Sequence, residues 1–252
     1  MSPWELGLLV LSLGFAGLVK GVTGFGLPLF ATPILAGLFG ARQAVVIMSI
    51  PAFLSNLAVL YSCRRDLLVV RELSDVMIAG AVGVVVGDLL LATLDQNLLA
   101  LVIAGVVLFF LARADRLLGN NPRTHGVKLM GPLIGGLSGL LLGGTSIAGP
   151  LLALYLHSKR LPPREFVASL TVVIQVFATV QLIGFWQLGL YNRSSVAVGL
   201  LSLLPALLAV AIGVRVRGRV NTETFRTVIS VLLALSAINL IVQGLRGFGV
   251  FS

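Results

Sequence analysis

Long apolar runs, separated by short polar or charged stretches, cover nearly the whole chain. Taken as helices, the runs lie at about 4–20, 26–39, 43–61, 73–93, 97–112, 127–142, 145–157, 166–189, 195–214 and 225–243. A helix of about 20 apolar residues is long enough to cross the core of a bilayer. The pattern therefore predicts an all-α polytopic membrane protein of about 8–10 helical segments.

Two of these segments, 26–39 and 145–157, are too short to cross a core about 30 Å thick as straight helices. Each follows a glycine-rich stretch, Gly17-Leu-Val-Lys-Gly21-Val-Thr-Gly24-Phe-Gly26-Leu-Pro28 in the first half and Gly135-Gly-Leu-Ser-Gly139-Leu-Leu-Leu-Gly143-Gly144-Thr-Ser-Ile-Ala-Gly149-Pro150 in the second. We expect half-helices, or the arms of hairpins that re-enter the membrane. Glycine-broken helices at matching places in two halves indicate a transporter binding site.

The basic residues predict the orientation. With the N-terminus outside and every segment counted as a crossing, most of the 18 Lys and Arg residues fall in cytoplasmic loops. These are Arg64, Arg65, Arg71, Arg113, Arg116, Arg123, Lys128, Lys159, Arg160, Arg164, Arg215, Arg217, Arg219 and Arg226, against Arg42, Arg193 and Arg246 outside. The C-terminus is then outside as well.

The same segments predict how the chain is divided. We expect a first transmembrane repeat at 1–112, a cytoplasmic linker at 113–126 and a second repeat at 127–252, together forming one integrated membrane domain. Each half holds an odd number of segments, so the two repeats would have inverted topology.

Composition agrees with a location in the membrane and narrows the partners. Hydrophobic residues make up 58% of the chain and charged residues only 11%, where soluble domains carry about 25% charged residues. The net charge of +9 comes from sparse basic residues at segment ends, so no nucleic-acid partner is expected. Cys63 is the single cysteine, which excludes an intramolecular disulfide and a cysteine-rich metal site, and no cofactor or metal is predicted.

The two glycine turns predict an anion site. Two helices that begin inside the membrane direct amide N–H groups and positive dipole ends toward the same region. The predicted substrate-binding residues are Lys20, Thr23, Gly24, Phe25, Gly26, Asn56, Ser138, Gly143, Gly144, Thr145, Ser146 and Gln175.

Other interpretations of these residues stay open. Lys20 either serves the site or extends from a complete first helix to the cytoplasmic surface. Asn56 and Gln175 either line the cavity or tie helices together. Glycines also permit close helix packing, which is the interpretation for Gly80, Gly83 and Gly87, whereas binding is favoured for the paired signatures. Asp88, toward the outer end of its segment, is interpreted as structural.

The glycine signatures resemble the TauE/SafE family of sulfite and organosulfonate exporters, also called TSUP, over nearly the whole chain. The family pattern is a doubled Gly-x-x-x-Gly-x-x-Gly-x-Gly-Gly-Gly followed by proline. The chain departs from it at Phe25, at Leu142, where glycine is usual, and at Thr145, where the triplet would end. The resemblance implies transport, usually export, of small sulfur-containing or carboxylic anions.

We therefore predict a secondary transporter of a small anion (sulfite, an organosulfonate or a small carboxylate) that exports it by alternating access between inverted repeats. It would be a multi-pass protein of a bacterial or archaeal cell membrane, with the lipid bilayer as its surroundings and no enzymatic activity. The coupling ion, a proton or sodium, and the oligomeric state stay open. The alternatives are an intramembrane serine protease that uses Ser138, with only His125 and His157 as possible bases, and a membrane subunit for assembly or lipid handling.

Overall fold

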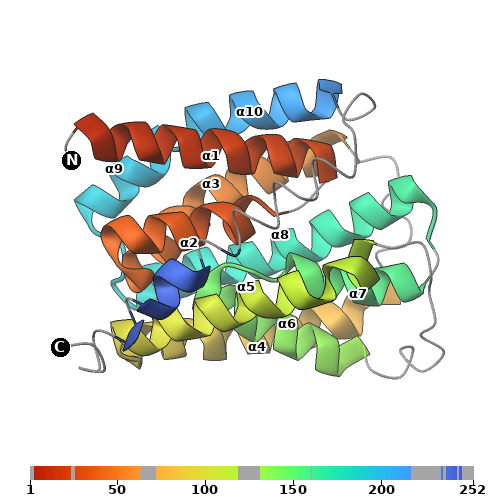
Figure 1. Ribbon diagram of the computed structural model, residues 1–252. Helices are drawn as coiled ribbons and strands as arrows, with labels where there is room; N and C mark the ends of the chain where they lie inside the picture. The colour runs from red at the N-terminus through yellow and green to blue at the C-terminus, as the bar shows by residue number, and fades with distance from the viewer. Residues whose placement is uncertain are drawn as a thin grey trace.

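The computed structural model of the protein describes residues 3–23, 26–62, 72–118, 131–159, 161–216, 234, 237–242 and 244–245. These residues form helices joined by turns, and no strand occurs among them (Figure 1). The helices are α1 (Pro3–Thr23), α2 (Leu27–Phe39), α3 (Ala41–Ser62), α4 (Ser74–Thr93), α5 (Gln96–Leu118), α6 (Gly131–Thr145), α7 (Gly149–Ser158), α8 (Pro163–Gln187), α9 (Arg193–Leu201) and α10 (Leu203–Val216).

The prediction of an all-α polytopic membrane protein is confirmed. Within the described residues, 4 helical stretches are long and apolar enough to cross a membrane, judged by length and composition. They are Ala41–Tyr61, Ser74–Thr93, Glu165–Gln187 and Arg193–Val216. The helices also begin and end close to the predicted positions, with two differences.

The first difference is in the segment predicted at 195–214, which is divided at Ser202 into α9 and α10. Pro205 follows the division, and because proline has no N–H it cannot supply a helical hydrogen bond there. The second difference is in α5, which continues through Leu118 and so includes the first part of the predicted linker. Most of the predicted segment at 225–243 lies outside the described residues, although 237–242 are helical.

Two helix pairs pack at very short distance through glycines. An added Cβ at Gly17 would lie 2.6 Å from the Ala206 carbonyl oxygen of α10, and Gly21, one turn later, faces Gly213 of the same helix. In the second half, Gly135 and Gly139 of α6 likewise lie directly against the backbone of α4. Because contacts advance along both partners in the same direction, α1 runs parallel to α10, and α6 runs parallel to α4.

The remaining directions follow from contacts at the end of α4. The Nε atom of Arg42, in the first turn of α3, donates to the Leu91 carbonyl at 2.9 Å, and its Nη2 atom donates to the Leu94 carbonyl at 2.7 Å. Near the same end, Gly184 of α8 contacts the side chain of Asp88. Helix α3 therefore begins on the side of the molecule where both α4 and α8 end.

Corresponding helices of the two halves thus run in opposite directions. Helix α9 begins where α8 ends, so α10, and α1 parallel to it, run away from that side. Helix α6 runs with α4 toward that side, which makes it opposite to α1, just as α8 is opposite to α3. These directions are those that inverted repeats require. The repeat boundary itself stays a prediction, since residues 119–130 lie outside the described residues.

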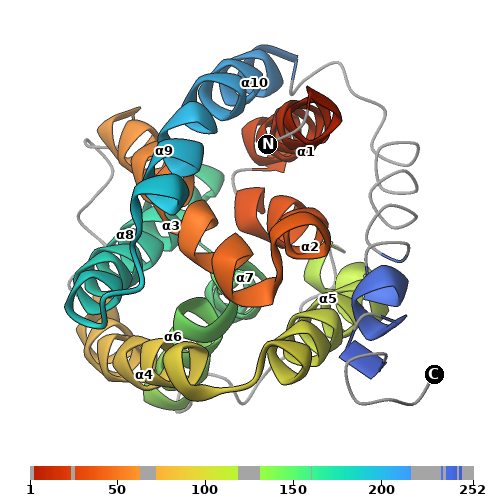
Figure 2. The ribbon, with the colours of Figure 1, turned by 90° about the vertical axis from the view of Figure 1, so that its left-hand side faces the viewer.

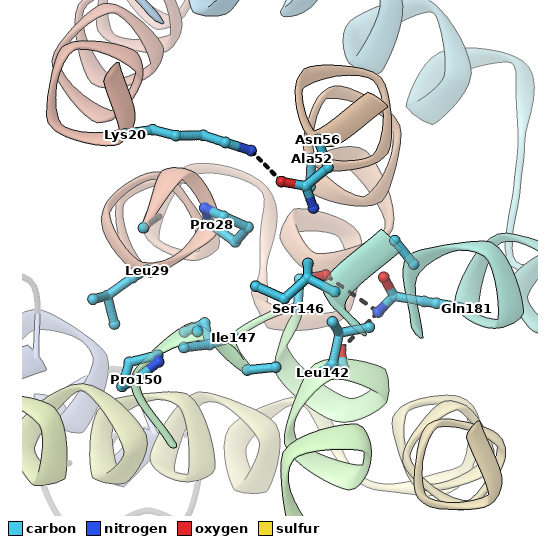
Figure 3. Close-up of a pocket in the computed structure, with 15 residues that line it drawn as sticks. Lys20, Pro28, Leu29, Ala52, Asn56, Leu142, Ser146, Ile147, Pro150 and Gln181 are labelled. Atoms are coloured by element: carbon cyan, nitrogen blue, oxygen red, sulfur yellow. Dashed lines mark hydrogen bonds between the residues drawn. The ribbon is translucent and has the colours of Figure 1, made fainter. Parts of the chain in front are cut away.

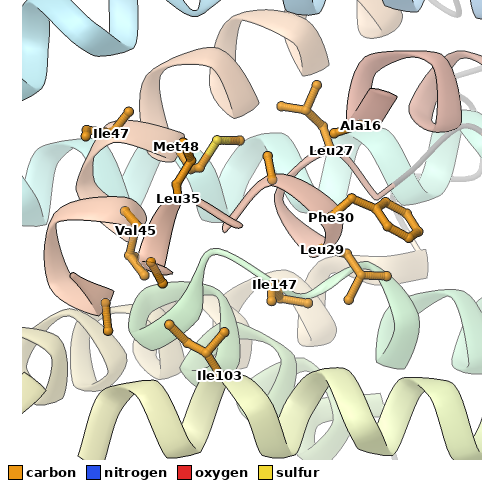
Figure 4. Close-up of a cluster of buried hydrophobic side chains, with 14 of the residues drawn as sticks. Ala16, Leu27, Leu29, Phe30, Leu35, Val45, Ile47, Met48, Ile103 and Ile147 are labelled. Carbon is orange, nitrogen blue, oxygen red and sulfur yellow. The ribbon is translucent and has the colours of Figure 1, made fainter. Parts of the chain in front are cut away.

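The short helices α2 and α7 lie in the interior of the bundle. Figure 2, which looks roughly along the helices, shows them surrounded by the longer ones. A cluster of buried apolar side chains packs around α2, with Phe30 and Leu27 from α2, Ile47 and Met48 from α3 and Ile147 from the turn before α7 (Figure 4). This packing fixes where the N-terminus of α2 lies.

Candidate functional site

The first helix break separates α1 from α2. Helix α1 ends at Thr23 and α2 begins at Leu27. Gly26 precedes α2 with a φ of 105°, a backbone conformation that glycine adopts without steric cost. The carbonyl of Gly26 accepts the first helical hydrogen bond, from the Phe30 N–H at 3.2 Å. Pro28 lies in the first turn, where a missing N–H costs little.

The second break separates α6 from α7 and contains a strained serine. Ser146 has a φ of 60°, and the left-handed conformation costs a residue with a side chain about 1–2 kcal/mol. Its N–H donates to the Leu142 carbonyl at 2.6 Å. The next N–H, of Ile147, donates to the Thr145 hydroxyl at 3.2 Å. Both predicted breaks are therefore present, and α7 begins at Gly149.

Hydrogen bonds from two other helices hold the second break in place. The amide Nε2 of Gln181, in α8, donates to the Leu142 carbonyl at 2.7 Å and contacts Ser146 Oγ at 3.3 Å. The Ser146 hydroxyl in turn donates to the Val45 carbonyl of α3 at 3.3 Å. The strained serine is thus tied to α8 and to α3.

A pocket lies between the two breaks. Lys20 and Asn56 form one part of its wall, and Ser146 and Gln181 lie opposite (Figure 3). The first turns of both half-helices also line it, through Gly26 and Pro28 of the first break and Gly149 and Pro150 of the second. The space open to the centres of water molecules is about 40 Å³, and one buried water needs roughly 10–15 Å³ of such space. The pocket therefore suits a ligand of a few heavy atoms.

Lys20 brings a buried positive charge to this pocket. Its side chain is only 3% exposed. The ammonium Nζ donates to Ser55 Oγ at 2.8 Å and to Asn56 Oδ1 at 2.6 Å. Both partners are neutral, and no acidic side chain in the described part of the chain forms an ion pair with Lys20. Of the two interpretations left open for Lys20, this arrangement fits a place at the pocket and does not fit an extension to the membrane surface.

The structure brings only part of the predicted set of binding residues together. Lys20, Gly26, Asn56 and Ser146 line the pocket. Thr23 ends α1, and only its backbone is described. The predicted residues Gly24 and Phe25 lie outside the described residues.

The other predicted residues lie away from the pocket wall. They are Ser138, Gly143, Gly144 and Thr145 of α6 and Gln175 of α8. The Thr145 hydroxyl donates to the Leu141 carbonyl of its own helix at 2.6 Å. Ser138 is fully buried, and its hydroxyl has no hydrogen-bond partner among the described residues, whereas an activated serine needs a neighbouring base. Of the two histidines, His125 lies outside the described residues, and the side chain of His157 is not described.

The glycine signatures require a partial correction. Binding was favoured over packing for them, yet Gly17 and Gly21 pack on α10, and Gly135, Gly139 and Gly143 pack on α4. Their spacing of four residues places them on one helix face, which is also the requirement for close packing. Among the described glycines of the signatures, Gly26 and Gly149, each next to a break, line the pocket.

Sequence reasoning missed one prominent pocket residue. Gln181 is buried and holds Ser146 in place, but in the sequence it is simply one of several amides inside apolar segments. Its distance from the glycine signature along the chain, 35 positions from Ser146, hides the contact.

Oppositely directed sets of helices, with two broken helices meeting at a buried cation, are typical of secondary membrane transporters. The chain belongs to the sulfite exporter TauE/SafE family, because the model of that family matches residues 9–240. The resemblance noted in the glycine signatures is confirmed, and the protein is a membrane transporter. Neither the curated proteins nor the solved structures compared with the chain include a match.

Proposed function

We propose that the pocket between the two breaks binds a small anion, such as sulfite, an organosulfonate or a small carboxylate, and that the protein exports it across the cell membrane. The observation that carries the proposal is the buried Lys20 ammonium, bonded only to neutral groups beside the N-termini of two half-helices. The name of the family is in agreement with such a substrate.

The charge balance of the pocket favours an anion over any other ligand. A buried, unpaired charge costs several kcal/mol, because it loses its hydration. A bound anion would compensate it, since opposite unit charges about 4 Å apart attract by roughly 4 kcal/mol at an effective dielectric constant of about 20. The N-termini of α2 and α7 add N–H donors and positive dipole ends. A cation would meet repulsion from all three.

The size and lining of the pocket favour a small substrate. Its free space, about 40 Å³ for the centres of water molecules, suits a head group such as sulfite or sulfonate. Apolar side chains complete the wall, among them Leu29, Ile147 and Ile174. A short organic group on a sulfonate or carboxylate would pack against them without leaving polar groups unpaired.

The opposed helix directions support alternating access. In such transporters one set of helices moves against the other around a fixed site near the middle of the membrane. Here each half contributes one broken helix to the pocket, and the tight pairs α1 with α10 and α4 with α6 join the two halves. We propose that these pairs move as units and expose the pocket to each side in turn.

Counterflow into proteoliposomes tests the proposal. Vesicles with the full chain are loaded with unlabelled methanesulfonate or sulfite, and uptake of the labelled anion is followed. Saturable uptake is expected for the wild type. Lys20→Met should lose it, with binding weakened on the order of 100-fold, the equivalent of about 3 kcal/mol. The matched control is Lys159→Met at the end of α7, where the ammonium lies 5.5 Å from the centre of the Tyr155 ring.

Two results would count against the proposal. Wild-type uptake of every tested anion at the level of empty vesicles would remove the transport function. Equal uptake by Lys20→Met and the wild type would leave transport in place but move the anion site away from this pocket.

A further inference from the structure

Asp88 is a buried carboxyl group that the anion site does not use. It lies in α4 and is 1% exposed, and neither of its carboxyl oxygens has a hydrogen-bond partner among the described residues. The chain makes room for it with glycines from two neighbouring helices. An added Cβ at Gly143 of α6 would lie 2.9 Å from Asp88 Oδ1, and one at Gly184 of α8 would collide with Oδ2.

No opposite charge compensates Asp88 from the elements packed against it. Helix α6 contains no titratable residue, and the only ones in α8, Arg164 and Glu165, lie in its first turn, at the far end from Gly184. Arg42 of α3 donates to the carbonyls at the end of α4. Tyr191, which follows α8, offers no positive charge, and its hydroxyl lies 2.7 Å from that of Ser49.

An ionised carboxylate in these surroundings would be both dehydrated and unpaired, and each condition favours the neutral acid. A bound sodium ion is a poorer explanation, because metal cations of this kind require several oxygen ligands. The two residues against the carboxyl oxygens are glycines, which offer no side-chain ligand. The arrangement therefore suits a proton.

We propose that Asp88 is a proton-binding site whose protonation is coupled to movement of the α4–α6 pair against α8, so that anion transport is coupled to a proton. This proposal rests on the transport function proposed above. Asp88 contacts Gly143, one position from the Leu142 carbonyl that accepts the Gln181 amide, and Gln181 also holds Ser146 in the pocket wall. Release of the proton needs water at Asp88, which requires the seam between the α4–α6 pair and α8 to open, and this opening shifts the wall that the Gln181 bond holds.

A groove already present beside Asp88 leads toward the side where α8 ends, and it gives the proton a route to that side. It is lined by Asp88, by Leu89 on α4 and by Gly184 on α8, and it extends to Gln187 and Leu188 where α8 ends. The proton balance is one proton per transport cycle: in one access state the Asp88 carboxylate takes a proton from water on that side, and in the other state the carboxylic acid releases it to water on the opposite side. No other reactant takes part.

Transport driven by a pH gradient tests the coupling. The probe is labelled methanesulfonate, whose charge does not change near neutral pH, in proteoliposomes with the membrane potential clamped. With one proton per anion, a gradient of one pH unit should shift the wild-type distribution by up to about tenfold. Asp88→Asn, which imitates the protonated acid, should keep counterflow but lose this shift. Asp95→Asn, in the exposed turn before α5, should behave as the wild type.

Each remaining outcome is decisive. A pH-driven shift that persists in Asp88→Asn overturns the proposal, and so does a shift that follows a sodium gradient in the wild type and is lost in Asp88→Asn. An absence of wild-type counterflow would instead refute the proposed function. Infrared spectra then test the protonation by itself, because the wild type at neutral pH should show a carboxylic-acid carbonyl band that Asp88→Asn lacks. Absence of that band in the wild type overturns the proposal even if the variant fails to fold.

Discussion

Lys20 and Asn56 illustrate how a buried charge and its neutral partner depend on each other. Hydrogen bonds to a charged group contribute about 1.5–3 kcal/mol, which is less than the cost of removing an ammonium from water. The two bonds from Lys20 therefore reduce the cost of burial without removing it. The remaining cost is what makes the pocket attract an anion.

This dependence predicts non-additive effects on stability. Asn56→Leu alone should lower the free energy of unfolding by about 1.5–3 kcal/mol, because the ammonium loses an acceptor at 2.6 Å. Lys20→Met alone should leave stability unchanged or raise it, since an apolar side chain of similar size replaces a buried charge. In the Lys20→Met background, Asn56→Leu should cost less than about 1 kcal/mol. Thermal unfolding in detergent compares the wild type, the two single variants and the double variant. Additive effects of the two substitutions on stability would contradict the interpretation that Asn56 stabilises the Lys20 charge.

The sequence predicts a buried, positively charged site better than it predicts which residues form that site. Lys20 was recognisable because a charge within an apolar run is rare, but its environment was not. Its partner Asn56 lies 36 positions away, and only folding brings the two together. The strain at Ser146 was equally hidden, because its backbone conformation is held by a hydrogen bond that its hydroxyl accepts from Gln181 and one that the hydroxyl donates to the Val45 carbonyl.

Glycines decide how closely the broken helices approach the rest of the bundle. Between apolar helices in a membrane, association depends on van der Waals packing, because lipid tails are as apolar as the side chains. Removing side chains along one face lets backbones approach, as at Gly139 of α6 against Gly80 of α4. The same helix end then turns into the pocket, so packing and site share one element.

A pair of substitutions on α6 tests this role of glycine. At Gly139 an added Cβ would lie 2.7 Å from the carbonyl carbon of Gly80, so Gly139→Ala should destabilise the protein by about 1–3 kcal/mol. At Gly136 the nearest atom, the Ala79 carbonyl oxygen, is 3.7 Å away. Gly136→Ala should therefore be neutral, or stabilising by up to about 1 kcal/mol through its better helix propensity. The melting temperature of Gly139→Ala should therefore be lower than that of Gly136→Ala. The reverse order would mean that α6 packs through another face.

The helices were more predictable than the roles of their glycines. Segment lengths revealed that α2 and α7 are too short to span, because length and apolar composition are local properties. The division at Ser202 was missed, since the apolar run continues through it. The glycine spacing was ambiguous in principle, because one residue type serves both positive φ and close packing, and only the neighbouring helix decides between them.

The helix directions show at which end of the bundle each basic residue lies. Arg42 and Arg193 lie at the end of the bundle where α4 and α8 finish, and Lys159 and Arg215 lie at the other. Arg42 is accounted for by its bonds to two carbonyls at the C-terminus of α4, where cations are favourable. With Arg42 explained locally, the excess of basic residues that the sequence gives to the loops on the opposite side predicts that this side is cytoplasmic.

Labelling of cysteines at the two ends of α4 tests this orientation. After Cys63→Ser, single-cysteine variants Asp75→Cys and Asp95→Cys place one thiol in the exposed first turn of α4 and the other just beyond its C-terminus. A membrane-impermeant maleimide added to intact cells should modify Asp95→Cys at once. It should modify Asp75→Cys only after permeabilisation, because we expect the thiol at position 75 to face the cytoplasm. The opposite pattern would invert the protein in the membrane, and labelling of both thiols from one side would mean that α4 does not cross it. Since α6 runs parallel to α4, the result also fixes the direction in which the second broken helix enters the bilayer.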